Sequence, residues 1–451
     1  YYFMTPFLWL FNYNPVGPAV MVALFGIATV WLVFFVAREF FSTKAALIAA
    51  SLYAVSPLVI AYSRSSWNPN LLPFFSLLTL YFVYKGIKNN NFWDFLFSGI
   101  SIGIALQLHY LTTFLGVVVV AFSLIGFVYT CFMRKEKFSG MVQFILKSYL
   151  GLLVGFLLGF SLFILFEVRH GFENTKNIIH FILFSKDTGA GNNFISIVND
   201  VFFRLFGRLA TDYPPPEQVS LQGHTLITIW YVLTLILAVC AVSFLIYQLV
   251  KYIKDRKRFL QYALLFIWLV VGVLLFGFYK KEIYDYYFAF LFPLPFLLIG
   301  GFLGYLFEKP NVFKVISSVS FIILFVLNLQ AMPFRYTPNR QLNQMETISR
   351  FVMDKTNGKP FNFALITGGN SDYAYRYFFT VWGHPPVTID NYAVDPARKT
   401  VTGQLLVVCE EACHPEGDSL WEVAGFGRAK IAGEWNVSVV QVYKLVHYTG
   451  K

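Results

Sequence analysis

The chain has 451 residues, of which 57% are hydrophobic, 20% aromatic and only 13% charged. Its mean hydropathy is +0.60. Soluble domains carry charges on about a quarter of their residues, so this composition excludes a wholly soluble protein. The net charge of +11 lies mostly in loops between apolar stretches, where membrane orientation explains it, so it does not indicate nucleic-acid binding.

A helix needs about 20 apolar residues to cross the hydrocarbon layer. About ten stretches are long enough or nearly so, and a polar segment of mixed composition follows them. We therefore predict an α-helical polytopic membrane domain over residues 1–334 and a soluble α/β domain over 335–451. The predicted spans are 16–37, 45–62, 70–85, 94–109, 111–132, 142–166, 223–250, 259–279, 286–307 and 312–332.

Basic residues are unevenly divided between alternate short loops, and one set carries only Arg64, Lys280 and Lys281. Basic residues stay on the cytoplasmic side of short loops, so the richer set is placed in the cytoplasm. The chain then starts outside, and an even number of spans leaves 335–451 outside the inner (plasma) membrane. The cytoplasmic set comprises Arg38, Lys44, Lys85, Lys88, Arg134, Lys135, Lys137, Lys147, Lys251, Lys254, Arg256, Lys257, Arg258, Lys309 and Lys314.

The start of the sequence predicts a truncated chain. The first residue is Tyr1, the first methionine is Met4, and no basic signal-peptide region precedes the apolar stretch. We therefore expect at least one earlier span and an outer loop upstream of Tyr1.

The first outer loop of chemical interest covers residues 62–70. Arg64 offers a planar fork of donors to an anion, Trp67 offers a face to a sugar ring, and Asn68 both donates and accepts hydrogen bonds. The alternative is structural: Trp67 belongs to the aromatic belt at the membrane interface, and Arg64 reaches toward lipid head groups.

A second outer loop, residues 280–287, combines cations, carboxylates and phenols at one membrane boundary. Lys281 and Tyr286 are candidate donors to a lipid phosphate, and Glu282 and Asp285 would share a face on a helix. The alternative is an aromatic belt with self-paired charges.

The turn at His109 and Tyr110 is the third outer candidate, against the alternative of a hydrogen-bonded structural histidine.

The long outer loop, residues 167–222, begins with a group of charged residues that includes Arg169. Its stretch 192–210 has apolar residues at helical spacing and predicts an amphipathic helix in the interface plane. The glycine-rich piece 188–192 would let the neighbouring helices move as a gate, or it is surface filler.

The polar tail predicts alternating helices and strands. We expect helices near 340–355 and 371–383, and strands at 361–367, 405–409 and 437–446. Cys409 and Cys413 form the only local cysteine cluster, followed at once by His414. A short disulfide, two free thiols and a metal site remain open, although two thiols and one histidine lack a fourth zinc ligand.

Three passages resemble the GT-C membrane glycosyltransferases that take sugars from polyprenyl phosphate, among them the protein O-mannosyltransferases and the aminoarabinose transferases of lipid A. The passages are Gly26-Ile27-Ala28-Thr29-Val30 through Ala37-Arg38-Glu39-Phe40-Phe41; Ala45 to Ala50 through Leu52-Tyr53-Ala54-Val55-Ser56-Pro57 to Tyr62-Ser63-Arg64; and Tyr286-Tyr287 with Pro293-Leu294-Pro295. In organisation, the resemblance covers residues 1–330.

The resemblance implies single displacement at the anomeric carbon with inversion. It implies that Arg64, Lys281 and Tyr286 stabilise the leaving phosphate, that Trp67, His109 and Tyr110 line the sugar pocket, and that Arg169 is a further candidate.

The general base is expected in the outer loop upstream of Tyr1. Many relatives place an acid shortly after the arginine of the second outer loop, whereas this chain has Asn68 and Asn70 there. Glu282 and Asp285 are the substitute candidates for that acid.

The implied partners are a polyprenyl-phosphate-linked sugar, membrane lipids and an acceptor that is a protein, a lipid or a glycan; no nucleic acid, metal or other cofactor is assigned. A transporter or lipid flippase is the main rival, although no internal repeat and no charge in the middle of a span supports it. A non-catalytic scaffold is the third interpretation. An oligosaccharyltransferase is disfavoured because no Trp-Trp-Asp run occurs.

Overall fold

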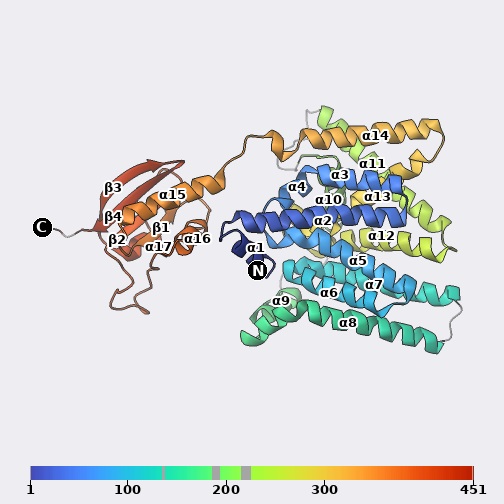
Figure 1. The fold of residues 1–451 in the computed structure, drawn as a ribbon, viewed down its shortest axis with the longest axis horizontal. Coiled ribbons are helices and arrows are strands. Elements are labelled where there is room, and N and C mark those ends of the chain that lie inside the picture. The colour runs from blue at the N-terminus through green and yellow to red at the C-terminus, as the bar shows by residue number, and fades with distance from the viewer. Residues whose placement is uncertain (1, 135–137, 185–192, 215–224, 449, 451) are drawn as a thin grey trace. The chain divides into compact units, whose positions relative to one another are not determined.

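The computed structural model describes residues 2–134, 138–184, 193–214, 225–448 and 450. It divides into two compact units, Tyr1–Tyr336 and Thr337–Lys451. The first is a bundle of helices that lie side by side, and the second is a small sheet covered by helices (Figure 1). Each unit has its own buried apolar core.

Among the described residues of the first unit, the elements are α-helices and short 3-10 helices. In chain order these are α1 (Met4–Leu10), α2 (Val16–Phe40), α3 (Thr43–Val55), α4 (Pro57–Ser63), η1 (Asn68–Leu71), α5 (Leu72–Asn89), α6 (Phe92–Leu108), η2 (Tyr110–Thr112), α7 (Thr113–Arg134), α8 (Phe138–Arg169), α9 (Glu173–Phe184), α10 (Phe194–Ala210), α11 (Thr225–Lys251), α12 (Arg256–Leu274), η4 (Leu275–Phe278), η5 (Asp285–Leu291), α13 (Pro293–Phe307), α14 (Asn311–Gln330) and η6 (Pro333–Arg335).

Where the structure describes them, the predicted membrane spans are helical apart from short breaks. Within the described part of the chain, seven helices are long and apolar enough to cross a membrane, or nine if each bent pair is one span. Helix α6 is a further apolar helix of 17 residues. The pair α3 and α4 bends by 62° at Pro57, and the pair η5 and α13 bends by 54° at Pro293. A proline at the first position of a helix lacks the N–H needed to continue the preceding one, which explains both breaks.

Helices α6 and α8 are in close backbone contact through glycines. A Cβ atom added to Gly99 would overlap the carbonyl oxygen of Leu152, and one added to Gly155 would overlap that of Leu96. The Gln107 amide spans the same contact, donating to the carbonyls of Gly159 at 2.7 Å and Gly103 at 3.0 Å. In a membrane the hydrophobic effect does not drive helices together, so helix association depends on close van der Waals packing. Small residues such as glycine allow this packing.

Helix α10 confirms the predicted amphipathic helix. Its apolar residues Val201, Leu205 and Leu209 are fully buried in the core of the bundle, where α10 packs against α11, α12, α13 and η5. This apolar face is covered by other helices of the bundle, and the expectation that the helix lies in the plane of the membrane interface stays a prediction. The glycine-rich piece 188–192 lies outside the described residues.

The second unit is a mixed four-stranded sheet with helices on both faces. Its elements are α15 (Gln341–Thr356), β1 (Asn362–Ile366), α16 (Tyr373–Val381), β2 (Gln404–Cys409), α17 (Trp421–Phe426), β3 (Ala429–Val437) and β4 (Val440–His447). The strand order is β1-β2-β4-β3; β1 and β2 are parallel, and β4 is antiparallel to both of its neighbours. One core contains residues of α15 and α16, and the other contains residues of α17.

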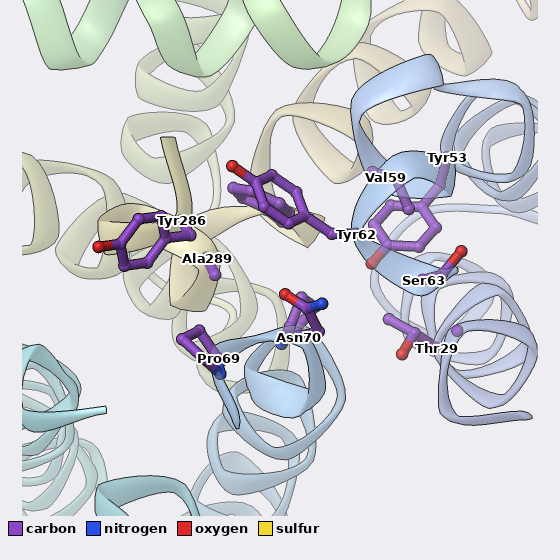
Figure 2. Close-up of a pocket in the computed structure, with 12 residues that line it drawn as sticks. Thr29, Tyr53, Val59, Tyr62, Ser63, Pro69, Asn70, Tyr286 and Ala289 are labelled. Atoms are coloured by element: carbon purple, nitrogen blue, oxygen red, sulfur yellow. The ribbon is translucent and has the colours of Figure 1, made fainter. Parts of the chain in front are cut away.

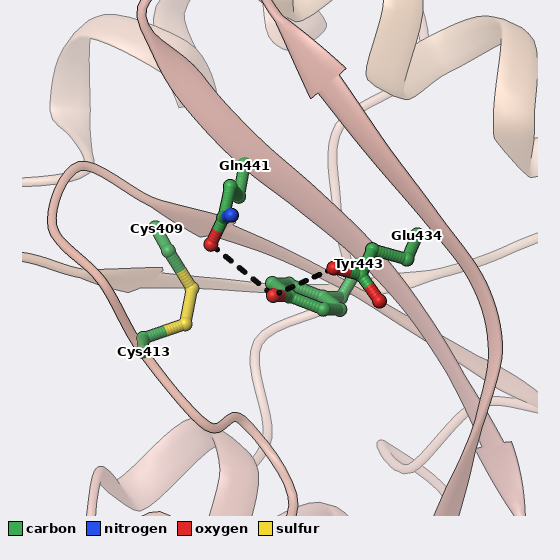
Figure 3. The surroundings of a disulfide bond; sticks show 5 residues. All are labelled: Cys409, Cys413, Glu434, Gln441 and Tyr443. Atoms are coloured by element: carbon green, nitrogen blue, oxygen red, sulfur yellow. Dashed lines mark hydrogen bonds between the residues drawn. A yellow bond between two sulfur atoms is a disulfide. The ribbon is translucent and has the colours of Figure 1, made fainter.

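Cys409 and Cys413 form a disulfide at the end of β2. Beside it the hydroxyl of Tyr443 donates to Gln441 and Glu434, at 3.2 and 3.3 Å (Figure 3). This observation decides between the alternatives that the sequence left open for these two cysteines.

Candidate functional site

Three segments that are far apart in sequence meet through their aromatic side chains. Trp67, in the turn before η1, lies with its ring centre 4.2 Å from that of Tyr286 in η5. His109, between α6 and η2, lies 5.7 Å from Tyr286 and 5.2 Å from Tyr287. Tyr110 stacks on His109 at 4.7 Å. The structure therefore brings together four predicted site residues: Trp67, His109, Tyr110 and Tyr286.

Further tyrosines complete this group. The hydroxyls of Tyr110 and Tyr279 are 2.9 Å apart, and the ring of Tyr279 lies 5.7 Å from that of Tyr287. Tyr284 stacks with Tyr286 at 5.8 Å. We call the whole group the aromatic cluster; it comprises Trp67, His109, Tyr110, Tyr279, Tyr284, Tyr286 and Tyr287. Aromatic faces and phenolic hydroxyls together suit a sugar ring and its hydroxyl groups.

The tautomer of His109 follows from its contacts. Its Nδ1 accepts a hydrogen bond of 3.3 Å from the backbone N–H of Leu111, so in the neutral ring Nε2 carries the proton and can donate. A neutral His109 can therefore donate a hydrogen bond through Nε2.

A narrow cavity of about 20 Å³ lies beside the cluster, lined by Thr29, Tyr53, Tyr62, Ser63, Asn70 and Tyr286 among others (Figure 2). The amide nitrogen of Asn70 donates to the Ser65 carbonyl at 2.7 Å, whereas its buried Oδ1 has no hydrogen-bond partner in the described part of the chain. This volume holds about one water molecule, so a sugar would need the surrounding side chains to move.

The predicted cationic residues lie on the surface. Arg64 is exposed at the end of α4, and its guanidinium carbon lies 5.2 Å from the centre of the Phe334 ring. Lys281 is exposed on the chain leading into η5, five residues before Tyr286. Neither Arg64 nor Arg169 forms an ion pair with the acids that the structure describes.

Arg169 and Asn68 are not part of the aromatic cluster. Arg169 is exposed at the end of α8, a helix that packs mainly against α6. Asn68 is exposed at the start of η1, next to Trp67.

The two acidic candidates have different surroundings. Glu282 is exposed and accepts a hydrogen bond of 3.1 Å from the hydroxyl of Tyr284. Both oxygens of Asp285 accept from guanidinium groups, Oδ1 from Arg204 and Oδ2 from Arg208. Because both oxygens are occupied, this geometry does not support Asp285 as a proton acceptor. Among the described residues, no group of three or more His, Cys, Asp or Glu side chains is placed to hold a metal.

Sequence reasoning missed Tyr279, Arg204 and Arg208. Tyr279 ends a predicted span, where an interfacial tyrosine is common. The two arginines are four residues apart on one face of α10, but nothing in the sequence identifies Asp285 as their shared partner.

A family described as dolichyl-phosphate-mannose-protein mannosyltransferase matches residues 1–165. None of the curated proteins matches the chain significantly in sequence. Several solved structures are similar in fold. ArnT from Cupriavidus metallidurans, bound to undecaprenyl phosphate, is 13% identical with a TM-score of 0.56, over 98% of this chain and 86% of that one.

Another is the oligosaccharyltransferase AglB from Archaeoglobus fulgidus, in complex with an inhibitory peptide and a dolichol-phosphate. It is 13% identical with a TM-score of 0.50, over 90% of this chain and 60% of that one.

The fold thus defines a class: this is a multi-pass membrane protein with the GT-C fold. Over its first 165 residues the chain also matches a family of mannosyltransferases, which agrees with a glycosyltransferase. The resemblance seen in the sequence is confirmed at this level.

Proposed function

We propose that this protein transfers a sugar from a polyprenyl-phosphate donor to an acceptor at the outer membrane face, with inversion at the anomeric carbon. The observation that carries the proposal is the convergence of Trp67, His109, Tyr110 and Tyr286 in one cluster, between loops that carry Arg64 and Lys281. The GT-C neighbours support the donor class, because one is bound to undecaprenyl phosphate and another to dolichol-phosphate.

The chemistry is a single displacement. An oxygen of the acceptor bonds to the anomeric carbon as the bond from that carbon to the phosphate oxygen breaks, and the lipid phosphate leaves with both electrons. Arg64, Lys281 and the hydroxyl of Tyr286 would stabilise its developing charge. Trp67, Asn68, His109 and Tyr110 would bind the sugar, and Arg169 is a further candidate for the donor.

The proton of the acceptor must pass to a general base. The base is expected in an outer loop before Tyr1, and that assignment stays a prediction. Glu282 is the remaining substitute in the second outer loop, since it is exposed beside Tyr284.

The same proposal places the protein in the inner (plasma) membrane, with residues 337–451 on the extracytoplasmic side. The excess of basic residues in alternate short loops supports this orientation. A disulfide in the second unit is consistent with it, because disulfides persist outside the reducing cytoplasm.

The test is turnover of a labelled polyprenyl-phosphate sugar by the purified protein, with lipid, protein and glycan fractions offered as acceptors. Arg64→Ala should lower the rate by about 10²-fold or more, as loss of a charge-stabilising donor does, without changing the thermal unfolding of the protein. Arg258→Ala is the matched control, because Arg258 is also an exposed arginine over an aromatic ring, Tyr252 at 4.4 Å. Unchanged turnover in Arg64→Ala would remove Arg64 from the site.

A further inference from the structure

A partly buried group of two arginines and one aspartate joins helix α10 to the segment that carries Tyr286 and Tyr287 of the aromatic cluster. The guanidinium of Arg204 donates to Asp285 Oδ1 through Nε at 3.0 Å and Nη2 at 2.5 Å. Its Nη1 donates to the backbone carbonyl of Ile283 at 2.6 Å. Arg208 donates to Asp285 Oδ2 at 3.2 Å. We call Arg204, Arg208 and Asp285 the α10 clasp.

The clasp is largely removed from solvent. The side chains of Arg204 and Asp285 are each 13% exposed, and that of Arg208 is 16% exposed. The ring of Phe288 lies 5.3 Å from the guanidinium carbon of Arg204 and covers it. Hydrogen bonds between ionised groups at such a site are shorter and stronger than those between neutral groups.

The segment gripped by the clasp has little regular structure of its own. Residues 279–284 form no helix, and the 3-10 turn that follows is interrupted at Phe288, with φ −100° and ψ 23°. Its position therefore depends on side-chain contacts. Arg204 holds the Ile283 carbonyl and the Asp285 carboxylate, which flank Tyr284 and directly precede Tyr286 and Tyr287.

We propose that Arg204 is a positioning residue, which fixes the backbone of residues 283–285 so that Tyr286 and Tyr287 face Trp67 and His109. The inference rests on the proposed function. Arg204 does not touch the aromatic cluster itself but acts through the chain it holds. Helix α10 thereby supports the site without touching the aromatic cluster.

The guanidinium shape is what this role requires. Arg204 reaches a carboxylate and a backbone carbonyl at once, and also donates to Asp200 at 3.2 Å. A lysine keeps the charge, but its single nitrogen cannot reproduce the planar fork. Arg204→Lys therefore separates position from charge: the ion pair persists while the grip on Ile283 is lost.

The first readout is hydrogen exchange in the purified full chain, which needs no substrate. The amide of Tyr287 donates to the carbonyl of Tyr284 at 3.0 Å and reports whether the turn is formed. In Arg204→Lys, we expect exchange across 283–288 to rise at least tenfold, with α5 and α7 unchanged. Exchange equal to that of the natural protein would overturn the proposal.

The second readout is turnover of the labelled polyprenyl-phosphate sugar. Arg204→Lys should lower kcat at least tenfold and change KM for the donor less than threefold, because displaced phenols no longer stabilise the transition state. Arg258→Lys, at an exposed ion pair, is the control expected to match the natural protein. Faster exchange with kcat unchanged would also overturn the proposal.

The two readouts distinguish the two hypotheses. If the natural protein turns over no polyprenyl-phosphate sugar, the proposed function fails. The exchange measurement then still decides whether Arg204 holds residues 283–288.

Discussion

Two helices of the membrane unit are attached to the bundle by opposite means. Helix α8 lies on α6 through glycines whose lack of side chains lets the two backbones touch. Helix α10 is held to η5 by two arginines that share one aspartate. The first contact depends on shape and on the uncharged amide of Gln107, so it should be indifferent to pH and salt. The second depends on charge, and its strength comes from groups that become costly when left unpaired.

The largest expected effect is at the charged contact. Asp285→Ala leaves two partly buried guanidinium groups without their shared carboxylate, so we expect a loss of up to about 3 kcal/mol of stability. Thermal unfolding in detergent would measure it. Asp200→Ala is the control, since it removes a 44% exposed partner of the same Arg204 and should change stability by about 0–1 kcal/mol. Equal effects in the two variants would show that the clasp is no stronger than a surface pair.

The glycine contact is tested next. Gly155→Ala places a methyl group against the Leu96 carbonyl, and we expect a loss of about 1–3 kcal/mol from overpacking. Gly116→Ala in α7 is the matched control, because the nearest atom to its added Cβ, on Ile102, is 3.9 Å away. If the two variants unfold at the same temperature, the close backbone contact is not a source of stability.

A smaller effect is expected from the polar group inside the glycine contact. Gln107→Leu removes the hydrogen bonds to the carbonyls of Gly159 and Gly103, at an expected cost of about 0.6–1.7 kcal/mol. Thermal unfolding of the single variants and of Gln107→Leu with Gly155→Ala measures the coupling. If the two losses of stability add exactly in the double variant, the Gln107 amide and the glycine contact stabilise the protein independently.

The smallest effect is a pH dependence beside the clasp. Burial raises the pKa of Asp212 to about 6, and nearby Arg208 offsets only part of the shift. The folded state therefore favours the protonated acid. The resulting penalty is absent below the unfolded pKa and grows as pH rises through 6.

Asp212→Asn lacks this penalty. Between pH 5 and pH 8 its free energy of unfolding should therefore rise relative to that of the natural protein, by an amount on the order of 1 kcal/mol after allowing for solvent. Thermal unfolding at the two pH values measures this difference. Gly116→Ala should show no such trend. If the stability difference between Asp212→Asn and the natural protein is the same at both pH values, the pKa of Asp212 is not raised.

Much of the fold was predictable because a long stretch of apolar residues is enough to identify a membrane helix. In the described part of the chain, each predicted apolar stretch is helical apart from short breaks, and the break at Pro57 follows from the chemistry of proline. The α/β tail was predicted in outline, but β3 was missed. This strand is at the edge of the sheet and mostly exposed, so it lacks the buried alternation that marks a strand.

Less of the site could be predicted, because its residues depend on partners far away in the chain. Trp67, His109 and Tyr286 were selected by type and by their place at span ends, and they do meet. Asp285 was selected as an acid, whereas the structure pairs it with arginines 77 and 81 residues earlier. No local sequence pattern predicts such a pairing. Helical periodicity identifies which face of a helix is apolar, but it does not identify the segment that packs against that face.

The order of synthesis gives this long-range pairing a consequence for assembly in the membrane. Helix α10 leaves the ribosome well before Asp285, and at about 5–20 residues per second the delay is on the order of ten seconds. Until then Arg208 lacks the carboxylate of Asp285, and Arg204 has only Asp200 on its own helix. We therefore expect the charged contact between α10 and η5 to form late in synthesis, only after Asp285 has been made.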